Sequence, residues 1–156
     1  METKTNPPPT LVIRRVIPAK RDKVFAAWSK PELMSQWFRP PDGKAIVSND
    51  FRVGGSYQNT MIFSSDPNGH KGCGADCTSS SRPHHGSYLE IVPPEKIVFT
   101  WNSQIVSNSR VTVELRERGE STELTLTHEL LETEELRQQH SGGWDMCLSN
   151  LEKFFE

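Results

Sequence analysis

The sequence predicts a single α+β domain in which a curved antiparallel sheet wraps around a long C-terminal helix. Three observations predict it. Residues 45–128 consist largely of segments in which apolar and polar side chains alternate, as in strands with one buried and one solvated face. Apolar residues then recur at helical spacing almost to the end of the chain. The length of 156 residues suits one domain with one substantial core.

The N-terminal part is predicted to hold a tail, a strand and two short helices. Residues 1–9 are polar and end in three prolines, which predicts a flexible tail and places the domain at residues 10–156. Residues 11–17 are rich in β-branched side chains, as strands are. Residues 20–30 place their apolar side chains on one helical face, and Pro31 suits the first turn of a second helix.

Further strands are predicted after these helices, which gives a sheet of about six to seven strands. The segments that carry the strand pattern are 45–50, 57–63, 87–92, 97–101, 110–116 and 123–128. Gly119 and Glu120 lie between the last two and indicate a hairpin turn. A sheet with one apolar face needs a cover, and only the last segment is long enough to provide it.

The last segment is predicted to be an amphipathic helix. Thr133 suits the N-cap, and the two glutamates after it suit the first turn. Gly142 and Gly143 interrupt the pattern, so we expect a kink there or a restart capped by Ser141. A helix held by a curved sheet leaves an internal pocket between the two.

Five stretches of the chain carry a family resemblance. The first two are residues 14–19 and residues 31–40, which contain the sequences PEL and WF. The next two are residues 50–57 (DFRVGGSY) and 86–101 (GSYLEIVPPEKIVFTW). The fifth is the terminal segment with His140, Gly143, Trp144, Leu148 and Leu151. In this order they resemble the group related to the C-terminal domain of the activator of Hsp90 ATPase, within the START-like, helix-grip superfamily. The resemblance implies the helix-grip fold. It leaves function open, because this fold hosts lipid carriers, cyclases, stress proteins and co-chaperone domains.

The chain departs from that family in a polar insert, residues 64–85. The insert holds metal-competent side chains, namely His70, Cys73, Cys77, His84 and His85. Zinc prefers four nitrogen or sulfur ligands, so one prediction is a structural zinc site that orders the loop. The spacing is not that of a standard finger, and the alternatives are a mobile insert or a disulfide between its two cysteines. No other cofactor is expected.

Aromatic and apolar side chains on the predicted inner faces are candidates to line the pocket. They are Trp37, Phe63, Tyr88, Phe99, Trp101, Val113, His128, Trp144 and Leu148. Rings that carry one polar group suit an apolar ligand with a few polar atoms. We therefore expect the pocket to bind a small hydrophobic or aromatic molecule. For each side chain taken alone, packing in the core is the alternative.

His128 is the candidate catalytic residue, because it follows two leucines on the apolar face of its strand. A histidine there can also be satisfied by the surrounding protein. Candidate carboxylates are Glu32, Asp50 and Glu90, although Glu32 suits a helix terminus and the other two could pair with surface cations. A second functional hypothesis is thus an enzyme of the polyketide cyclase, dehydratase or hydrolase type. Interaction with an Hsp90-type chaperone is a third.

The charge of the chain excludes some classes of partner. Eighteen basic and 20 acidic residues give a net charge of −2, which argues against binding to nucleic acid or to anionic membrane surfaces. The first residues do not resemble a signal peptide, and we expect a cytoplasmic protein. An exposed sheet edge could support a homodimer.

Overall fold

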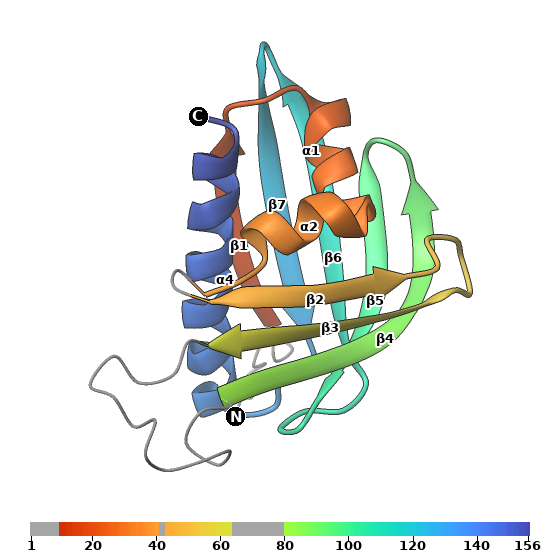
Figure 1. The fold of residues 1–156 in the computed structure, drawn as a ribbon, viewed down its shortest axis with the longest axis vertical. Coiled ribbons are helices and arrows are strands. Elements are labelled where there is room, and N and C mark those ends of the chain that lie inside the picture. The colour runs from red at the N-terminus through yellow and green to blue at the C-terminus, as the bar shows by residue number, and fades with distance from the viewer. Residues whose placement is uncertain (1–9, 41–42, 64–79) are drawn as a thin grey trace, which may run out of the picture.

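The computed structural model describes residues 10–40, 43–63 and 80–156, and these form one curled sheet with helices inside it (Figure 1). All seven strands pair antiparallel in the order β1-β7-β6-β5-β4-β3-β2. The elements are β1 (Thr10–Ile17), α1 (Arg21–Ser29), α2 (Pro31–Trp37), β2 (Lys44–Asn49), β3 (Ser56–Phe63), β4 (Ser80–Val92), β5 (Lys96–Ser103), β6 (Ser109–Arg118), β7 (Ser121–Glu129) and α4 (Glu134–Phe154).

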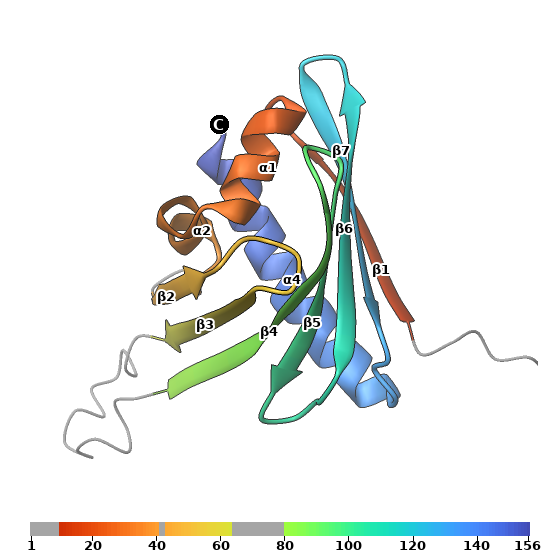
Figure 2. The ribbon, with the colours of Figure 1, turned by 90° about the vertical axis from the view of Figure 1, so that its right-hand side faces the viewer.

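The sheet wraps around α4, as the sequence predicts. Figure 2 shows α4 lying between the β1-β7-β6 side of the sheet and the β2-β3-β4 side, with α1 and α2 beside its C-terminal part. An ion-pair network ties α4 to β1, in which Arg15 contacts Asp145 and Glu152. The predicted α+β helix-grip architecture is confirmed. None of the described helices is long and apolar enough to cross a membrane.

The alternation of apolar residues in β6 and β7 explains which face of the sheet holds the helix. Val111, Val113, Leu124 and Leu126 are fully buried, while the residues between them are more exposed. Because side chains alternate across a strand, these four point to one side. His128 continues the same face at the end of β7, so the strand pattern carries a polar group into the buried layer.

The structure corrects two predicted boundaries. β4 begins at Ser80 rather than at residue 87, and residues 80–87 pair with β3. The predicted insert therefore overlaps a strand, and of its residues only 64–79 lie outside the described chain. The predicted restart of the helix with Ser141 as its cap is also wrong, because α4 continues through Gly142 and Gly143. Glycine costs a helix about 1 kcal/mol, which the buried residues that follow can offset.

The capping prediction for α4 is confirmed. The Thr133 hydroxyl accepts a hydrogen bond of 3.0 Å from the backbone N–H of Leu136. The side chain thus satisfies one of the N–H groups that the first helical turn leaves unpaired. This start places His140 and Trp144, four residues apart, on one face of the helix.

Candidate functional site

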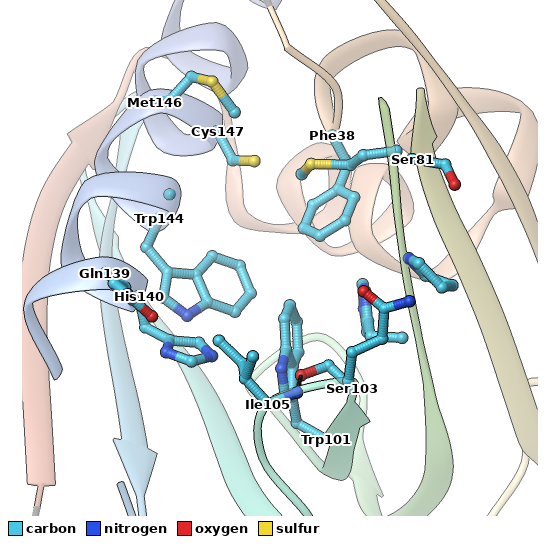
Figure 3. A pocket seen from close by; sticks show the side chains of 15 residues that line it. Phe38, Ser81, Trp101, Ser103, Ile105, Gln139, His140, Trp144, Met146 and Cys147 are labelled. Atoms are coloured by element: carbon cyan, nitrogen blue, oxygen red, sulfur yellow. Dashed lines mark hydrogen bonds between the residues drawn. The ribbon is translucent and has the colours of Figure 1, made fainter. Parts of the chain in front are cut away.

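A cavity of about 560 Å³ lies between α4 and the inner face of β3, β4 and β5 (Figure 3). This volume is typical of small-molecule sites. From α4 it is lined by Gln139, His140, Gly143, Trp144, Met146 and Cys147. The rest of the lining is Phe38, Met61, Ser81, Pro83, His84, Trp101, Ser103, Gln104 and Ile105. The β5–β6 loop contributes Ile105, which is 56% exposed and marks the open side.

Three aromatic side chains form the walls of the cavity. The ring of Trp144 lies 5.2 Å from that of Trp101 and 5.9 Å from that of Phe38, measured between centroids. These rings come from α4, from β5 and from the segment after α2, and Figure 3 shows them around the empty space. His84 extends the wall by stacking on Trp101 at 3.6 Å. Such ring faces and edges favour an apolar, aromatic occupant.

His128 lies behind this wall and joins its two tryptophans through hydrogen bonds. The indole N–H of Trp144 donates to His128 Nδ1 at 3.1 Å, so the ring proton resides on Nε2. Nε2 donates to the Ser109 hydroxyl at 2.9 Å, and Ser109 donates to the Trp101 carbonyl at 2.8 Å. Burial, together with the nearby His140, lowers the pKa of His128 to about 3. The ring is therefore neutral and both nitrogens are engaged.

These contacts give His128 a positioning function for Trp101 and Trp144. The side chain is fully buried and is not part of the cavity lining. Its predicted role as an acid or base is not tested by these contacts and stays a prediction. The three candidate carboxylates lie away from the cavity: Glu32 is exposed in α2, Asp50 pairs with Arg52 at 2.8 Å, and Glu90 pairs with Lys96 at 3.4 Å.

His140 is a lining residue that the sequence analysis did not single out as a site. Its Nδ1 lies 2.7 Å from the Leu136 carbonyl, and because a carbonyl can only accept, Nδ1 carries the proton. Burial lowers the pKa of His140, so the ring is neutral near pH 7. Its centroid lies 5.0 Å from that of His128. The helical spacing of four residues to Trp144 is the signal that could have identified it.

The predicted pocket residues fall into three groups. Trp101 and Trp144 line the cavity, whereas Tyr88 and Phe99 line only a second space of about 10 Å³, which shares Trp101 and Trp144 with the cavity. Trp37, Val113 and Leu148 are fully buried in the core and line neither space. The side chain of Phe63 lies outside the described residues. Sequence reasoning missed Phe38, which follows α2, His140 on α4, and Ile105 in the β5–β6 loop.

Polar atoms of the tryptophans do not reach the cavity as the sequence analysis expected. The Trp37 N–H donates to the Ala27 carbonyl at 3.0 Å. The N–H groups of Trp28 and Trp101 are buried and have no hydrogen-bond partner within the described part of the chain. The cavity is therefore polar through its histidines, serines and glutamines rather than through its indoles.

The predicted zinc ligands are only partly within the described chain. His70, Cys73 and Cys77 lie outside it. His84 and His85 are neighbours in β4, where His84 is buried and His85 is exposed. Neighbouring strand residues point to opposite faces, so these two side chains cannot bind one ion. Over residues 10–40, 43–63 and 80–156, no cluster of three or more His, Cys, Asp or Glu could hold a metal.

Cys147 is the one cysteine in the described segments, and its thiol lines the cavity. Its side chain is almost fully buried, and burial raises its pKa far above the ordinary value. The thiolate is the reactive form of cysteine, so this thiol is not an activated nucleophile. It acts as a small apolar wall residue.

Comparisons with known proteins give the family and the fold. A search of curated proteins finds no match. CV1439 from Chromobacterium violaceum has a similar structure with a TM-score of 0.74 at 23% identity, covering 94% of this chain and 96% of that one. CalU16 from Micromonospora echinospora gives 0.69 at 23% identity, over 94% of this chain and 76% of that one. At such identities the likeness shows the fold.

A third similar structure is DynU16, a protein of the dynemicin biosynthetic locus, with a TM-score of 0.71 at 19% identity. The match covers 95% of this chain and 47% of DynU16. The profile of the family described as activator of Hsp90 ATPase homolog 1-like protein matches residues 18–156. That range includes every element after β1 and every described residue that lines the cavity. It also includes His128, which lies behind the cavity wall. The chain belongs to the activator of Hsp90 ATPase homolog 1-like family.

Proposed function

We propose that this protein binds a small apolar or aromatic molecule in the cavity between α4 and the sheet. One observation carries the proposal: a space of about 560 Å³ is walled by Phe38, Trp101 and Trp144 and opens beside Ile105. Burial of apolar surface contributes about 25 cal/mol per Å², and ring contacts add to that. An aromatic ligand would be stabilised in this cavity both by burial of its apolar surface and by contacts with the rings.

The hydrogen bonds behind the wall support a site formed in advance of binding. Trp144 is held through His128 and Ser109 to the backbone of Trp101, so the helix and the strand that carry the two rings are tied together. A wall that is already ordered loses little conformational entropy when the ligand binds. The cavity therefore has the properties of a ligand site rather than of a packing defect.

An enzymatic role is the second candidate, and one observation favours it. His84 and His140, two titratable side chains, both line the cavity. Histidine is the residue most often used to move a proton in catalysis. If the ligand is a substrate, His140→Phe abolishes its turnover while the product still binds. Equal turnover by His140→Phe and the wild type would contradict an enzymatic role for this histidine.

Two-dimensional NMR of the indole N–H groups tests the binding proposal with naphthol methyl ether as the probe. The chain has four tryptophans, which report on different places. Trp101 and Trp144 line the cavity, and we expect their signals to shift saturably. Trp37 is fully buried and bonded to Ala27, and it serves as the internal control. No saturable shift, or equal shifts at all indoles, would contradict the proposal.

Two adjacent glycines of α4 provide a matched pair of variants. Gly143 lines the cavity and Gly142 does not, and a Cβ at either position meets no described atom within 4 Å. Gly143→Phe should fill the cavity and weaken binding of the probe, whereas Gly142→Phe should leave binding unchanged. Both variants alter the same helix in the same way, so a general effect on folding would affect both. Equal affinity in the two variants would overturn the proposed location.

A further inference from the structure

The described lining of the cavity contains no formally charged side chain. Among its lining residues within the described ranges, none is Asp, Glu, Lys or Arg. Moving an ion into such a site without a partner costs several kcal/mol. The lining therefore disfavours an ionised ligand, whichever sign its charge has.

The polar groups of the lining differ in their position. Ser81, Gln104 and Gln139 are exposed, so they belong to the open side of the cavity. His84 and His140 lie deeper, and His84 has one face covered by the stacked ring of Trp101. Figure 3 shows the His140 ring extending from α4 below Trp144. His140 is thus an interior polar side chain placed beside the aromatic walls.

One nitrogen of His140 is available to a ligand. Nδ1 is held by the Leu136 carbonyl at 2.7 Å, while Nε2 has no hydrogen-bond partner among the described residues. In the neutral ring Nε2 has a lone pair and no proton, so it can only accept a hydrogen bond. An acceptor left unpaired beside an apolar wall favours a ligand that brings a donor.

We propose, on the basis of the proposed function, that the ligand is an uncharged aromatic molecule whose hydroxyl or N–H group donates a hydrogen bond to His140 Nε2. The rings of Trp101 and Trp144 hold the aromatic part, and His140 selects the donor. A ligand that covers Nε2 excludes water from it, so an analogue that lacks the donor leaves this acceptor unpaired and binds more weakly.

Three probes of nearly equal shape test this selection: naphthol, its methyl ether and naphthoate. Calorimetric titration of the full chain at pH 7 should show naphthol binding about tenfold more tightly than the ether, the effect of one hydrogen bond. Naphthoate should bind more weakly than both, because it carries a charge. Equal affinity for naphthol and its ether would overturn the inference while leaving the proposed function intact. Failure of all three probes to bind would overturn both.

Two histidine variants distinguish a preference caused by the hydrogen-bond donor of naphthol from one caused by the larger size of the ether. His140→Phe keeps a ring and removes the acceptor, so the preference for naphthol over the ether should fall to about unity. His85 is exposed in β4 and does not line the cavity, so His85→Phe should keep the full preference. A preference that survives in His140→Phe would overturn the inference.

The imidazole nitrogen signals of the wild-type chain give a second readout that needs no folded variant. Naphthol should shift the Nε2 signal of His140 through the new hydrogen bond, whereas the ether should leave it nearly unchanged. The Nε2 signal of His128, already bonded to Ser109, should change less with either probe. A His140 shift of equal size with both probes would contradict donor selection.

Discussion

The two ends of α4 differ in how tightly they are packed, although the same sheet surrounds both. In the C-terminal half Leu148 and Leu151 are fully buried, and α1 and α2 lie beside this part of the helix (Figure 2). In the N-terminal half Gln139 is exposed and His140 is half-buried at the cavity. The packed end is filled by side chains of the two short helices, and the open end has no such cover among the described elements. We therefore assign core packing to the C-terminal end of α4, and the proposed ligand binding to the part of the helix from Gln139 to Cys147.

The same contrast holds for two histidines whose rings lie 5.0 Å apart. His128 has both nitrogens engaged within the protein, whereas His140 has one. Both rings are neutral because burial lowers their pKa. Their difference is one of available hydrogen bonds, which makes the first a positioning residue and the second a candidate ligand contact.

The largest expected effect is a loss of folding stability in acid, caused by the two buried histidines at the cavity wall. Burial lowers the pKa of His84 and of His128 to about 3, from an ordinary value of 6.5. Between these values the unfolded chain binds protons that the folded chain does not. Stability is therefore complete above about pH 6.5 and falls by about 1.4 kcal/mol per pH unit for each histidine below it.

Urea denaturation at pH 7.5 and at pH 5 measures this loss. We expect about 2 kcal/mol per histidine at pH 5 as an upper estimate, and a smaller loss for His84→Phe, which removes one titrating group. Equal free energies of unfolding at the two pH values would show that neither histidine is buried in its neutral form.

Truncation of leucine at the packed end should have the next largest effect. Leu151→Ala removes a fully buried side chain and should lower the free energy of unfolding by about 3 kcal/mol. Met146→Ala removes a partly buried residue that lines the cavity and should cost about 1 kcal/mol. Chemical denaturation of both variants tests the comparison, and equal losses would remove the distinction between the two ends.

Ser109→Ala should have a smaller effect, concentrated on the wall. It leaves the His128 N–H without its acceptor and should cost about 1 to 2 kcal/mol. We also expect the indole signal of Trp144 to shift, because its acceptor ring loses its anchor. Thermal unfolding and NMR measure the two effects. An unchanged Trp144 signal would show that the hydrogen-bond chain does not position the cavity wall.

The smallest expected effect is a gain of stability at the open end. Gly142→Ala and Gly143→Ala each replace a helical glycine where a Cβ meets no described atom within 4 Å. Each should stabilise the protein by about 0.5 to 1 kcal/mol. Thermal unfolding measures the gain, and a loss of stability in either variant would indicate a close contact that the structure does not show.

Periodicity was enough to predict the sheet and the last helix, because the inner faces of β6 and β7 are long and regular. It could not locate the start of β4, where residues 80–87 are polar and hold a proline yet pair fully with β3. Backbone pairing with a neighbouring strand decided that segment, and no local pattern reports it. The two glycines in α4 likewise led to a wrong expectation of a helix restart, because packing of the surrounding residues overrides the low helix propensity of glycine.

The site was less predictable than the fold. Trp101 and Trp144 were found because each lies on an apolar face, but the same rule selected Trp37, which packs in the core. Whether an inner side chain meets a cavity or another side chain depends on what the opposite element supplies. The role of His128 likewise depends on Trp144, which is 16 residues away and comes from another element. Such pairings cannot be read from spacing.

The most direct test of the central claim is a crystal structure of the full chain with naphthol. The account predicts electron density for the ring between Trp101 and Trp144, with its hydroxyl within hydrogen-bond distance of His140 Nε2. Density for the ring at another surface would contradict the claim. So would an unoccupied cavity, or rings that have closed over the space, in a crystal grown with saturating naphthol.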